Sequence, residues 1–256
     1  MSKLKYHKFE KTNGAARICL ARPKHNVLNL DMMKELNSVL ESLCSDKELK
    51  CLVFLGEGKS WCAGVEVGDH KPECAPEMIE TFDRIFDLLG QLDVPVIAAV
   101  HGACLGGGME LAIGCDIVFA SANAKFGQPE IKLGFFPPYA AARLPEIVGT
   151  SKAIEICTTG RTYTAREALE LGFVSKVVEE EKFTETVDAL VDEICYNSPL
   201  IIRMNKRAIK MVRGCEPREA AKKTNDYFLN SLMKTEDTLE GIKSFEEKRK
   251  PVWKNK

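Results

Sequence analysis

Two glutamates lie twenty residues apart in a stretch that is otherwise apolar or rich in glycine. Glu110 follows three consecutive glycines in "GACLGGGMELAIGCD" (102–116), and Glu130 ends "FGQPE". An ionised carboxylate without a partner is costly in apolar surroundings, and a single glutamate of this kind is most often ion-paired or half-exposed. Two of them beside one glycine-rich turn are harder to explain in this way, which makes them candidates for general acid–base chemistry. Such a pair titrates together, so the sequence does not say which carboxyl is protonated at rest.

The glycines follow a predicted buried strand, "VPVIAAV" (94–100), and precede a predicted short helix near residues 108–114. A turn of this kind directs backbone N–H groups, and the positive end of a helix dipole, at whatever binds there. Phosphate fits poorly, because the sequence has neither G-x-x-x-x-G-K-[ST] nor G-x-G-x-x-G at this place. Close packing beside the helix is the other explanation for Gly106, Gly107 and Gly108.

A second loop, "GEGKSWCAGVEVGD" (56–69), also follows a predicted buried strand and also contains glycine. Two loops at the ends of strands could each offer one backbone N–H to the same oxygen atom. Such a pair of donors forms an oxyanion hole, and the loss of one donor costs about 3 kcal/mol of transition-state stabilisation. The sequence therefore predicts an oxyanion hole between the two loops.

The segments "FLGEGKSWCAGVEV" and "PVIAAVHGACLGGGMELAIGCDIVFASANAKFGQPEIKLGFFP" resemble those of the crotonase (enoyl-CoA hydratase/isomerase) superfamily. The resemblance extends from "ICLARPKHNVLN" near the start to "GIKSFEEKRKPVW" near the end. It implies that the N–H groups of Val65 and Gly107 hold the thioester carbonyl of an acyl-coenzyme A while it becomes an enolate. Substrate-binding residues beside them would be Ala63, Gly64 and Gly106. The resemblance also implies that no metal or redox cofactor is needed, and that coenzyme A arrives as part of the substrate.

Enoyl-CoA hydratases of this superfamily keep both glutamates, and Glu110 and Glu130 match the two positions. The resemblance implies that the pair holds a water molecule and adds it across a conjugated double bond. Glu130 would be the proton donor, and Glu110 would orient and activate the water. Three alternatives stay open: a general short-chain enoyl-CoA hydratase, a Δ3,Δ2-enoyl-CoA isomerase that uses Glu130 alone, and a non-catalytic RNA-binding or scaffolding homologue. The near-neutral charge and the intact pair speak against the last of these.

One segment, "KLGFFPPYAAARL" (132–144), departs from the "PGAGGTQRL" pattern that typical hydratases have there. Proline removes a backbone donor and flexibility at Pro138, so we expect a rebuilt pocket wall. Phe135, Phe136 and Tyr139 would then line an acyl pocket. Hydratases of cyclohexa-1,5-diene-1-carboxyl-CoA have a comparable proline-rich segment, so the resemblance implies an alicyclic substrate of this kind, from anaerobic aromatic breakdown; neutral drift in a surface turn is the alternative.

Three basic features could contact a ligand or a partner. Lys24 in "RPKHN" and Lys250 in "EKRKPVW" match stretches that in the superfamily lie near the nucleotide end of coenzyme A, although solvated lysines explain them equally well. His70 could touch the substrate, but a solvated loop histidine is the favoured interpretation. The basic stretch "RMNKRAIKMVR" (203–213) predicts a solvated or intersubunit helix face.

The first half of the sequence alternates strands and helices, which predicts an α/β core. Predicted strands cover 15–21, 50–56, 94–100 and "DIVFAS", and the first helix is expected to begin with Asp31 as its N-cap. A second helix is expected to have Pro76 in its first turn. The second half is mostly helical, with one short strand, "FVSKVV", and helices predicted at 151–159, 164–171, 181–196, 199–213, 217–232 and 235–248.

With the resemblance, this order implies a crotonase-type spiral of repeated ββα units over residues 1–195. A C-terminal helical trimerisation region follows over residues 196–256, whose amphipathic faces need a partner. The resemblance implies homotrimers, often paired into hexamers.

Composition excludes several classes of function. The chain of 256 residues carries a formal net charge of −1, which disfavours nucleic acid or an acidic membrane surface as a partner. The longest apolar run is too short to span a bilayer, and the N-terminal residues lack an apolar signal core, so we expect a cytoplasmic protein. None of the ten cysteines forms a C-x-x-C motif, and most fall in apolar patterns, which predicts structural thiols.

Overall fold

The computed structural model describes residues 4–256, and its larger sheet has six strands in the order β1-β2-β3-β5-β7-β10. β1 pairs antiparallel with β2, and every other neighbouring pair in this sheet is parallel. The central strands are continuous apolar runs because helices cover both of their faces. The strands are β1 (His7–Thr12), β2 (Ala15–Leu20), β3 (Cys51–Gly56), β5 (Val96–Val100), β7 (Ile117–Ser121) and β10 (Lys176–Val178).

A smaller sheet has four short strands in the order β4-β6-β8-β9. Three of them directly follow a strand of the larger sheet: β4 after β3, β6 after β5 and β8 after β7. Because β4 and β6 pair in parallel, the loops that leave their carboxyl ends lie next to each other. These strands have only three residues each, too few for an alternating pattern to predict them. They are β4 (Ser60–Cys62), β6 (Ala103–Leu105), β8 (Lys125–Gly127) and β9 (Thr162–Thr164).

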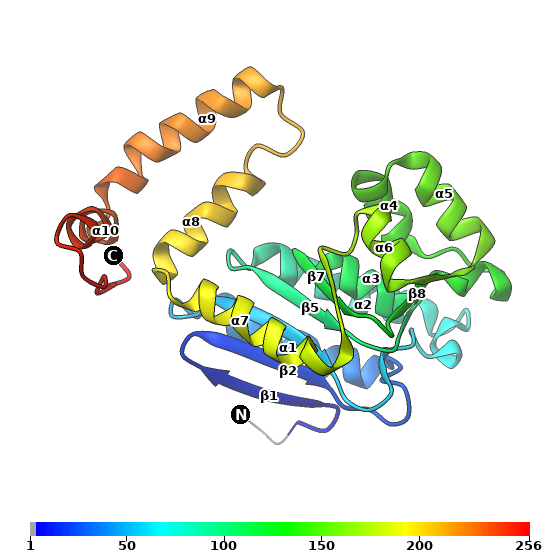
Figure 1. The fold of residues 1–256 in the computed structure, drawn as a ribbon. Helices are drawn as coiled ribbons and strands as arrows, with labels where there is room; N and C mark the ends of the chain where they lie inside the picture. Colours follow the sequence, from blue (N-terminus) through cyan, green and yellow to red (C-terminus); the bar gives the residue numbers. More distant parts are fainter. Residues whose placement is uncertain (1–3) are drawn as a thin grey trace.

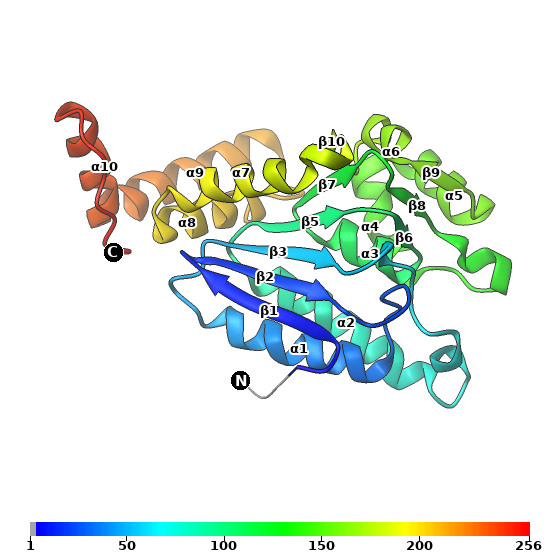
Figure 2. The same ribbon diagram turned by 60° about the horizontal axis from the view of Figure 1, so that its bottom comes forward.

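Helices cover the larger sheet on both sides. Figure 2 shows α1 (Leu30–Cys44) and α2 (Ala75–Gln91) on one face and α7 (Phe183–Cys195) on the opposite face. The prediction that Asp31 is the N-cap of the first helix is wrong. Asn29 caps α1 through its side-chain oxygen, and Asp31 lies inside the first turn, where its negative charge favours the helix dipole.

Four further helices surround the smaller sheet (Figure 1). One of them, α4, occupies part of the segment that departs from the typical hydratase pattern. It was not predicted, because a Pro–Pro pair is typical of a turn, whereas proline also suits the first turn of a helix. The four are α3 (Gly107–Gly114), α4 (Pro138–Val148), α5 (Thr150–Thr159) and α6 (Ala165–Leu171).

The last three helices form an arm that extends away from both sheets (Figures 1 and 2). This C-terminal arm consists of α8 (Pro199–Lys210), α9 (Pro217–Asn230) and α10 (Glu236–Glu246), which agree within a few residues with the predicted helices. α9 buries none of its residues, and Phe245 of α10 is 85% exposed. The predicted boundary after residue 195 falls between α7 and α8, and the division into two domains stays a prediction. Across residues 4–256, no helix is both long enough and apolar enough to cross a membrane.

Candidate active site

One cavity brings together most of the residues that the sequence singles out. Its volume is about 360 Å³, and α2 forms its apolar side with Met78 and Phe82. A larger groove of about 760 Å³ lies beside α7 and includes neither glutamate. The predicted site residues that border the smaller cavity are Ala63, Gly64, Val65, Gly106, Gly107, Glu110, Glu130, Phe135, Phe136 and Pro138.

Two backbone N–H groups lie close together in this cavity. A Cβ atom built on Gly107 would lie 3.5 Å from the nitrogen of Val65, and one built on Gly64 would lie 4.0 Å from the nitrogen of Gly107. Within residues 4–256 neither the Val65 nor the Gly107 N–H has a hydrogen-bond acceptor. Both groups are therefore available to an oxygen atom placed between the loops.

Local structure explains why these two donors are free. A parallel bridge to Leu28 uses the carbonyl of Gly64 and the N–H of Glu66, each at 2.8 Å, and so leaves the intervening Val65 N–H unpaired. Gly107 is the first residue of α3, where an N–H has no acceptor inside the helix.

Close contacts with neighbouring residues leave no room for a side chain at Gly106 or Gly108. Gly106 has a φ of +52°, and a Cβ atom there would lie 2.6 Å from Oε1 of Glu130. At Gly108, a Cβ atom would lie 2.2 Å from the carbonyl oxygen of Cys62. Both explanations drawn from the sequence therefore apply, because the glycines permit close packing and also present backbone to the cavity.

Glu110 is held by a backbone donor. Its side chain lies on α3, is 3% exposed, and accepts a hydrogen bond from the N–H of Ala140 at 2.8 Å. Burial raises the pKa of Glu110 to about 7; the Ala140 N–H opposes this rise, and the charge of Glu130 adds to it. No lysine, arginine or histidine between residues 4 and 256 forms an ion pair with Glu110.

Glu130 lies in the 3₁₀ turn η2 (Pro129–Leu133), and burial raises its pKa to about 7 as well. With its amide nitrogen turned toward this carboxyl, Gln128 donates to Oε2 and Oε1 at 3.0 and 3.2 Å. Gln128 is fully buried and was not singled out from the sequence. A polar residue directly before the Pro–Glu pair, inside an apolar stretch, is the signal that could have identified it.

Aromatic side chains close another part of the cavity. Phe135 and Phe136 border it, and the ring of His70 packs against Phe135 with centroids 5.1 Å apart. His70 therefore lies at the cavity, on the 3₁₀ turn η1 (Val67–His70), rather than in a remote solvated loop. Tyr139 lies behind the wall, where its ring stacks on Phe86 with centroids 3.4 Å apart, and it is not among the lining residues.

The two lysines that were expected near coenzyme A lie outside the lining of the cavity. Lys24 is exposed in the turn after β2, and Lys250 is exposed in the segment after α10. Neither borders the cavity, so their contact with a nucleotide stays a prediction.

The chain resembles known proteins over nearly its whole length. The profile of the enoyl-CoA hydratase/isomerase family matches residues 10–256. A short-chain-enoyl-CoA hydratase from Clostridium acetobutylicum is 36% identical, with 94% of each chain covered. A cyclohexa-1,5-dienecarbonyl-CoA hydratase from Thauera aromatica is 30% identical, over 96% of this chain and 95% of the relative. The crystal structure of an enoyl-CoA hydratase from Bacillus anthracis superposes with a TM-score of 0.93 at 28% identity, covering 98% of this chain and 100% of the other.

Proposed function

The chain belongs to the enoyl-CoA hydratase/isomerase family, and we propose that it is a hydro-lyase that adds water to the conjugated double bond of an enoyl-CoA thioester. One observation carries this proposal. Two glutamates with raised pKa values face the same cavity as two backbone N–H groups, and within residues 4–256 neither glutamate is ion-paired and neither N–H has an acceptor. That set contains an acid, a base and a site for a developing negative charge.

The two N–H groups would bind the thioester carbonyl oxygen. When water attacks the β-carbon, the electron pair of the double bond moves toward the carbonyl, and its oxygen becomes an enolate. Hydrogen bonds from Val65 and Gly107 strengthen as this charge grows, so they stabilise the transition state more than the bound substrate. We propose that no metal or redox cofactor is needed, because backbone donors supply this stabilisation.

The two glutamates would carry the proton transfers. Glu110 as carboxylate takes a proton from the water whose oxygen bonds to the β-carbon. Glu130 as carboxylic acid then gives its proton to the α-carbon. The proton that Glu110 took from the water returns to Glu130 and completes the cycle. Because both pKa values are about 7, the pair shares about one proton near neutral pH, which is the state that this cycle needs.

For the acyl group we propose an alicyclic diene thioester such as cyclohexa-1,5-diene-1-carboxyl-CoA. Pro138 borders the cavity at the start of α4, so the segment that departs from the typical pattern forms part of the cavity wall. The relative from Thauera aromatica is named for this substrate. The relative from Clostridium acetobutylicum is named for short-chain substrates, which makes crotonyl-CoA the second candidate.

We also propose that Lys24 and Lys250 contact the nucleotide of coenzyme A in an assembled trimer or hexamer. Exposed apolar side chains on the C-terminal arm support assembly, among them Phe228, Leu229 and Phe245. Light scattering that reports a monomer at micromolar concentration would contradict this part of the proposal.

The proposal is tested by following the absorbance of the conjugated thioester with purified protein. Crotonyl-CoA and cyclohexa-1,5-diene-1-carboxyl-CoA are assayed side by side, each with Glu130→Gln as the control. Turnover of the cyclic diene alone would support the alicyclic substrate. Fast hydration of crotonyl-CoA would identify a general short-chain hydratase, and absorbance loss from neither substrate would contradict hydration of both candidate acyl groups.

A further inference from the structure

Two cysteines from distant parts of the sequence meet on the α7 side of the larger sheet. Cys51 is the first residue of β3, Cys195 is the last residue of α7, and their sulfur atoms lie 4.0 Å apart. Both belong to the apolar cluster that packs α7 on the sheet. Between residues 4 and 256, no other pair of cysteines forms a sulfur–sulfur hydrogen bond.

The surroundings of Cys195 favour its thiolate. The thiol of Cys51 as hydrogen-bond donor and the nearby charge of Lys50 lower the pKa of Cys195, although partial burial opposes them. The Lys50 ammonium is fixed there because it donates to the Cys195 carbonyl at 2.6 Å. Cys195 is also partly exposed, so a small oxidant in solvent can reach it.

Four of the remaining cysteines lack a lowered pKa, solvent exposure or both. Cys62, Cys104 and Cys115 are buried, and burial raises their pKa values. Cys44 is exposed, but burial of part of its side chain raises its pKa, and its sulfur contacts the carbonyl of Leu88 rather than a second thiol. Cys51 and Cys195 therefore combine a reactive sulfur with a second sulfur positioned to resolve it.

We propose that Cys51 and Cys195 form a reversible oxidation site for hydroperoxides, in which a disulfide joins the end of α7 to the start of β3. The Cys195 thiolate attacks one oxygen of the peroxide; the O–O bond breaks, and a sulfenic acid and hydroxide form. The Cys51 sulfur then attacks the sulfur of this sulfenic acid while its S–H proton passes to the leaving hydroxide, so that water leaves and the S–S bond forms. In sum, two thiols and one hydrogen peroxide give one disulfide and two waters.

The position of this bond gives it a consequence for the C-terminal arm. The disulfide would join residues that are 144 positions apart in sequence. It would lie at the end of α7, directly before the C-terminal arm begins. Tyr196, the next residue, accepts a hydrogen bond from Trp253 at 2.8 Å, which ties the end of the chain to the same place. Closing such a long loop restricts the unfolded chain, so the oxidised protein should melt at a higher temperature than the reduced one.

The test is peptide mapping after mild oxidation. The native protein is treated with hydrogen peroxide in small molar excess, free thiols are blocked, and the protein is digested with trypsin without reduction. Cleavage after Lys50 and Lys182 yields peptides 51–59 and 183–203, each with a single cysteine. We expect these two peptides to be linked, with a mass equal to their sum less two hydrogens, and to separate on reduction.

Three variants make the result specific. Cys44→Ser, the matched control, should leave the linked peptides unchanged, whereas Cys195→Ser should abolish the link. Cys51→Ser should trap the sulfenic acid on peptide 183–203, where a dimedone probe labels it. Either of two results would overturn the proposal: peptide 183–203 oxidised but unlinked in the wild type, or linked mainly to a different cysteine.

Discussion

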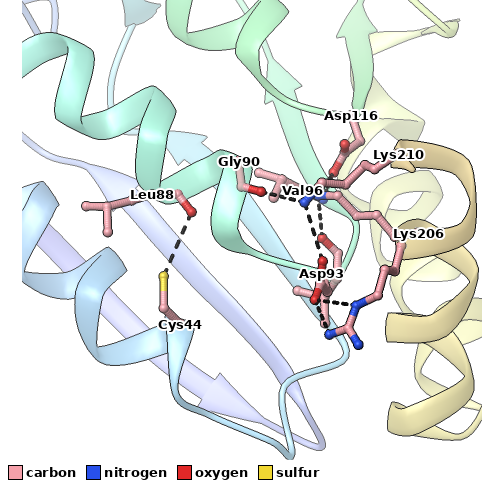
Figure 3. Close-up of polar contacts among 10 residues, drawn as sticks. Cys44, Leu88, Gly90, Asp93, Val96, Asp116, Lys206 and Lys210 are labelled. Atoms are coloured by element: carbon pink, nitrogen blue, oxygen red, sulfur yellow. Dashed lines mark hydrogen bonds and ion pairs between the residues drawn. The ribbon is translucent and has the colours of Figure 1, made fainter. Parts of the chain in front are cut away.

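Two groups of acids in this molecule have opposite surroundings. At the junction between the core and α8, Asp93 accepts from Arg207 at 2.6 Å and lies 3.4 Å from the ammonium of Lys210. Asp116 accepts from Lys206 at 2.5 Å (Figure 3). In the cavity, by contrast, Glu110 and Glu130 have only amide donors among the residues that the structure describes.

The difference appears in the pKa values. Burial raises the pKa of Asp93, but hydrogen bonds and charge from Arg207 and Lys210 outweigh burial and hold it below its ordinary value. No cation in the described part of the chain opposes the burial of Glu110 and Glu130, and both pKa values rise to about 7. Asp93 therefore stays ionised beside its cations, whereas the two cavity glutamates are poised to exchange protons.

The largest expected effect is on catalysis by Glu130→Gln. An amide of the same shape cannot give a proton to the α-carbon, so we expect kcat to fall by about 10³–10⁴-fold. The assay is hydration of whichever thioester the wild type turns over, with circular dichroism as the check on folding. A variant that keeps a tenth or more of wild-type activity would remove Glu130 from the proton-donor role.

Glu110→Gln separates hydration from isomerisation. We expect it to lower kcat for hydration by about 10²–10³-fold, because the water loses its base while the oxyanion donors stay in place. Unchanged turnover would sink the two-carboxylate mechanism. Movement of a Δ3 double bond by this variant, at the wild-type rate, would then favour the isomerase alternative.

Glu110→Gln should be more stable than the wild type at high pH. Because the pKa of Glu110 is raised in the folded protein, its contribution to stability is present below pH 4.5 and is lost as the pH rises through about 7. Above pH 7 the buried carboxylate costs on the order of 3 kcal/mol. Glu110→Gln should therefore raise Tm by several degrees at pH 8 and change it little at pH 5. Equal loss of Tm at both pH values would contradict this.

Asp116→Asn tests the opposite region. It leaves the mostly buried Lys206 without its carboxylate, and we expect a loss of about 2 kcal/mol in the free energy of unfolding, measured with urea, with kcat unchanged. Adding Lys206→Met should restore part of the lost free energy of unfolding, because the protein then no longer holds an unpaired cation. If the double variant is no more stable than Asp116→Asn alone, the ion pair does not stabilise the contact between α8 and the core.

The smallest effect is expected for Gln128→Met, which removes the two amide hydrogen bonds to Glu130 at nearly constant volume. We expect kcat to fall about tenfold. The pH at which activity is lost to deprotonation of Glu130 should also rise, because the amide favours the carboxylate. A lower kcat with an unshifted pH profile would indicate a packing role alone.

The sequence predicts the parts of this site that are local in the chain. Both glycine loops come after strong apolar strands, so the approach of the two loops could be inferred, and the superfamily resemblance named Val65 and Gly107 as the two donors. Glu110 and Glu130 could be singled out because they interrupt apolar stretches. The superfamily resemblance then supplied their order of action.

Other features depend on contacts between distant segments. Tyr139 was expected in the pocket, but the start of α4 carries its ring behind the wall onto Phe86. The basic stretch 203–213 was interpreted as a solvated or intersubunit face, whereas Lys206 and Arg207 reach acids more than 80 positions earlier. No local pattern shows which distant acid will meet a given cation.

The proposed reaction requires the two cavity glutamates to share one proton near neutral pH. Infrared difference spectroscopy of the native protein, titrated from pH 5 to pH 9, measures this through the carbonyl stretch of a protonated carboxyl. We predict one such band that disappears with an apparent pKa of about 7 and is altered in both Glu110→Gln and Glu130→Gln. A wild-type spectrum without a carboxyl band that titrates above pH 6 would contradict the account.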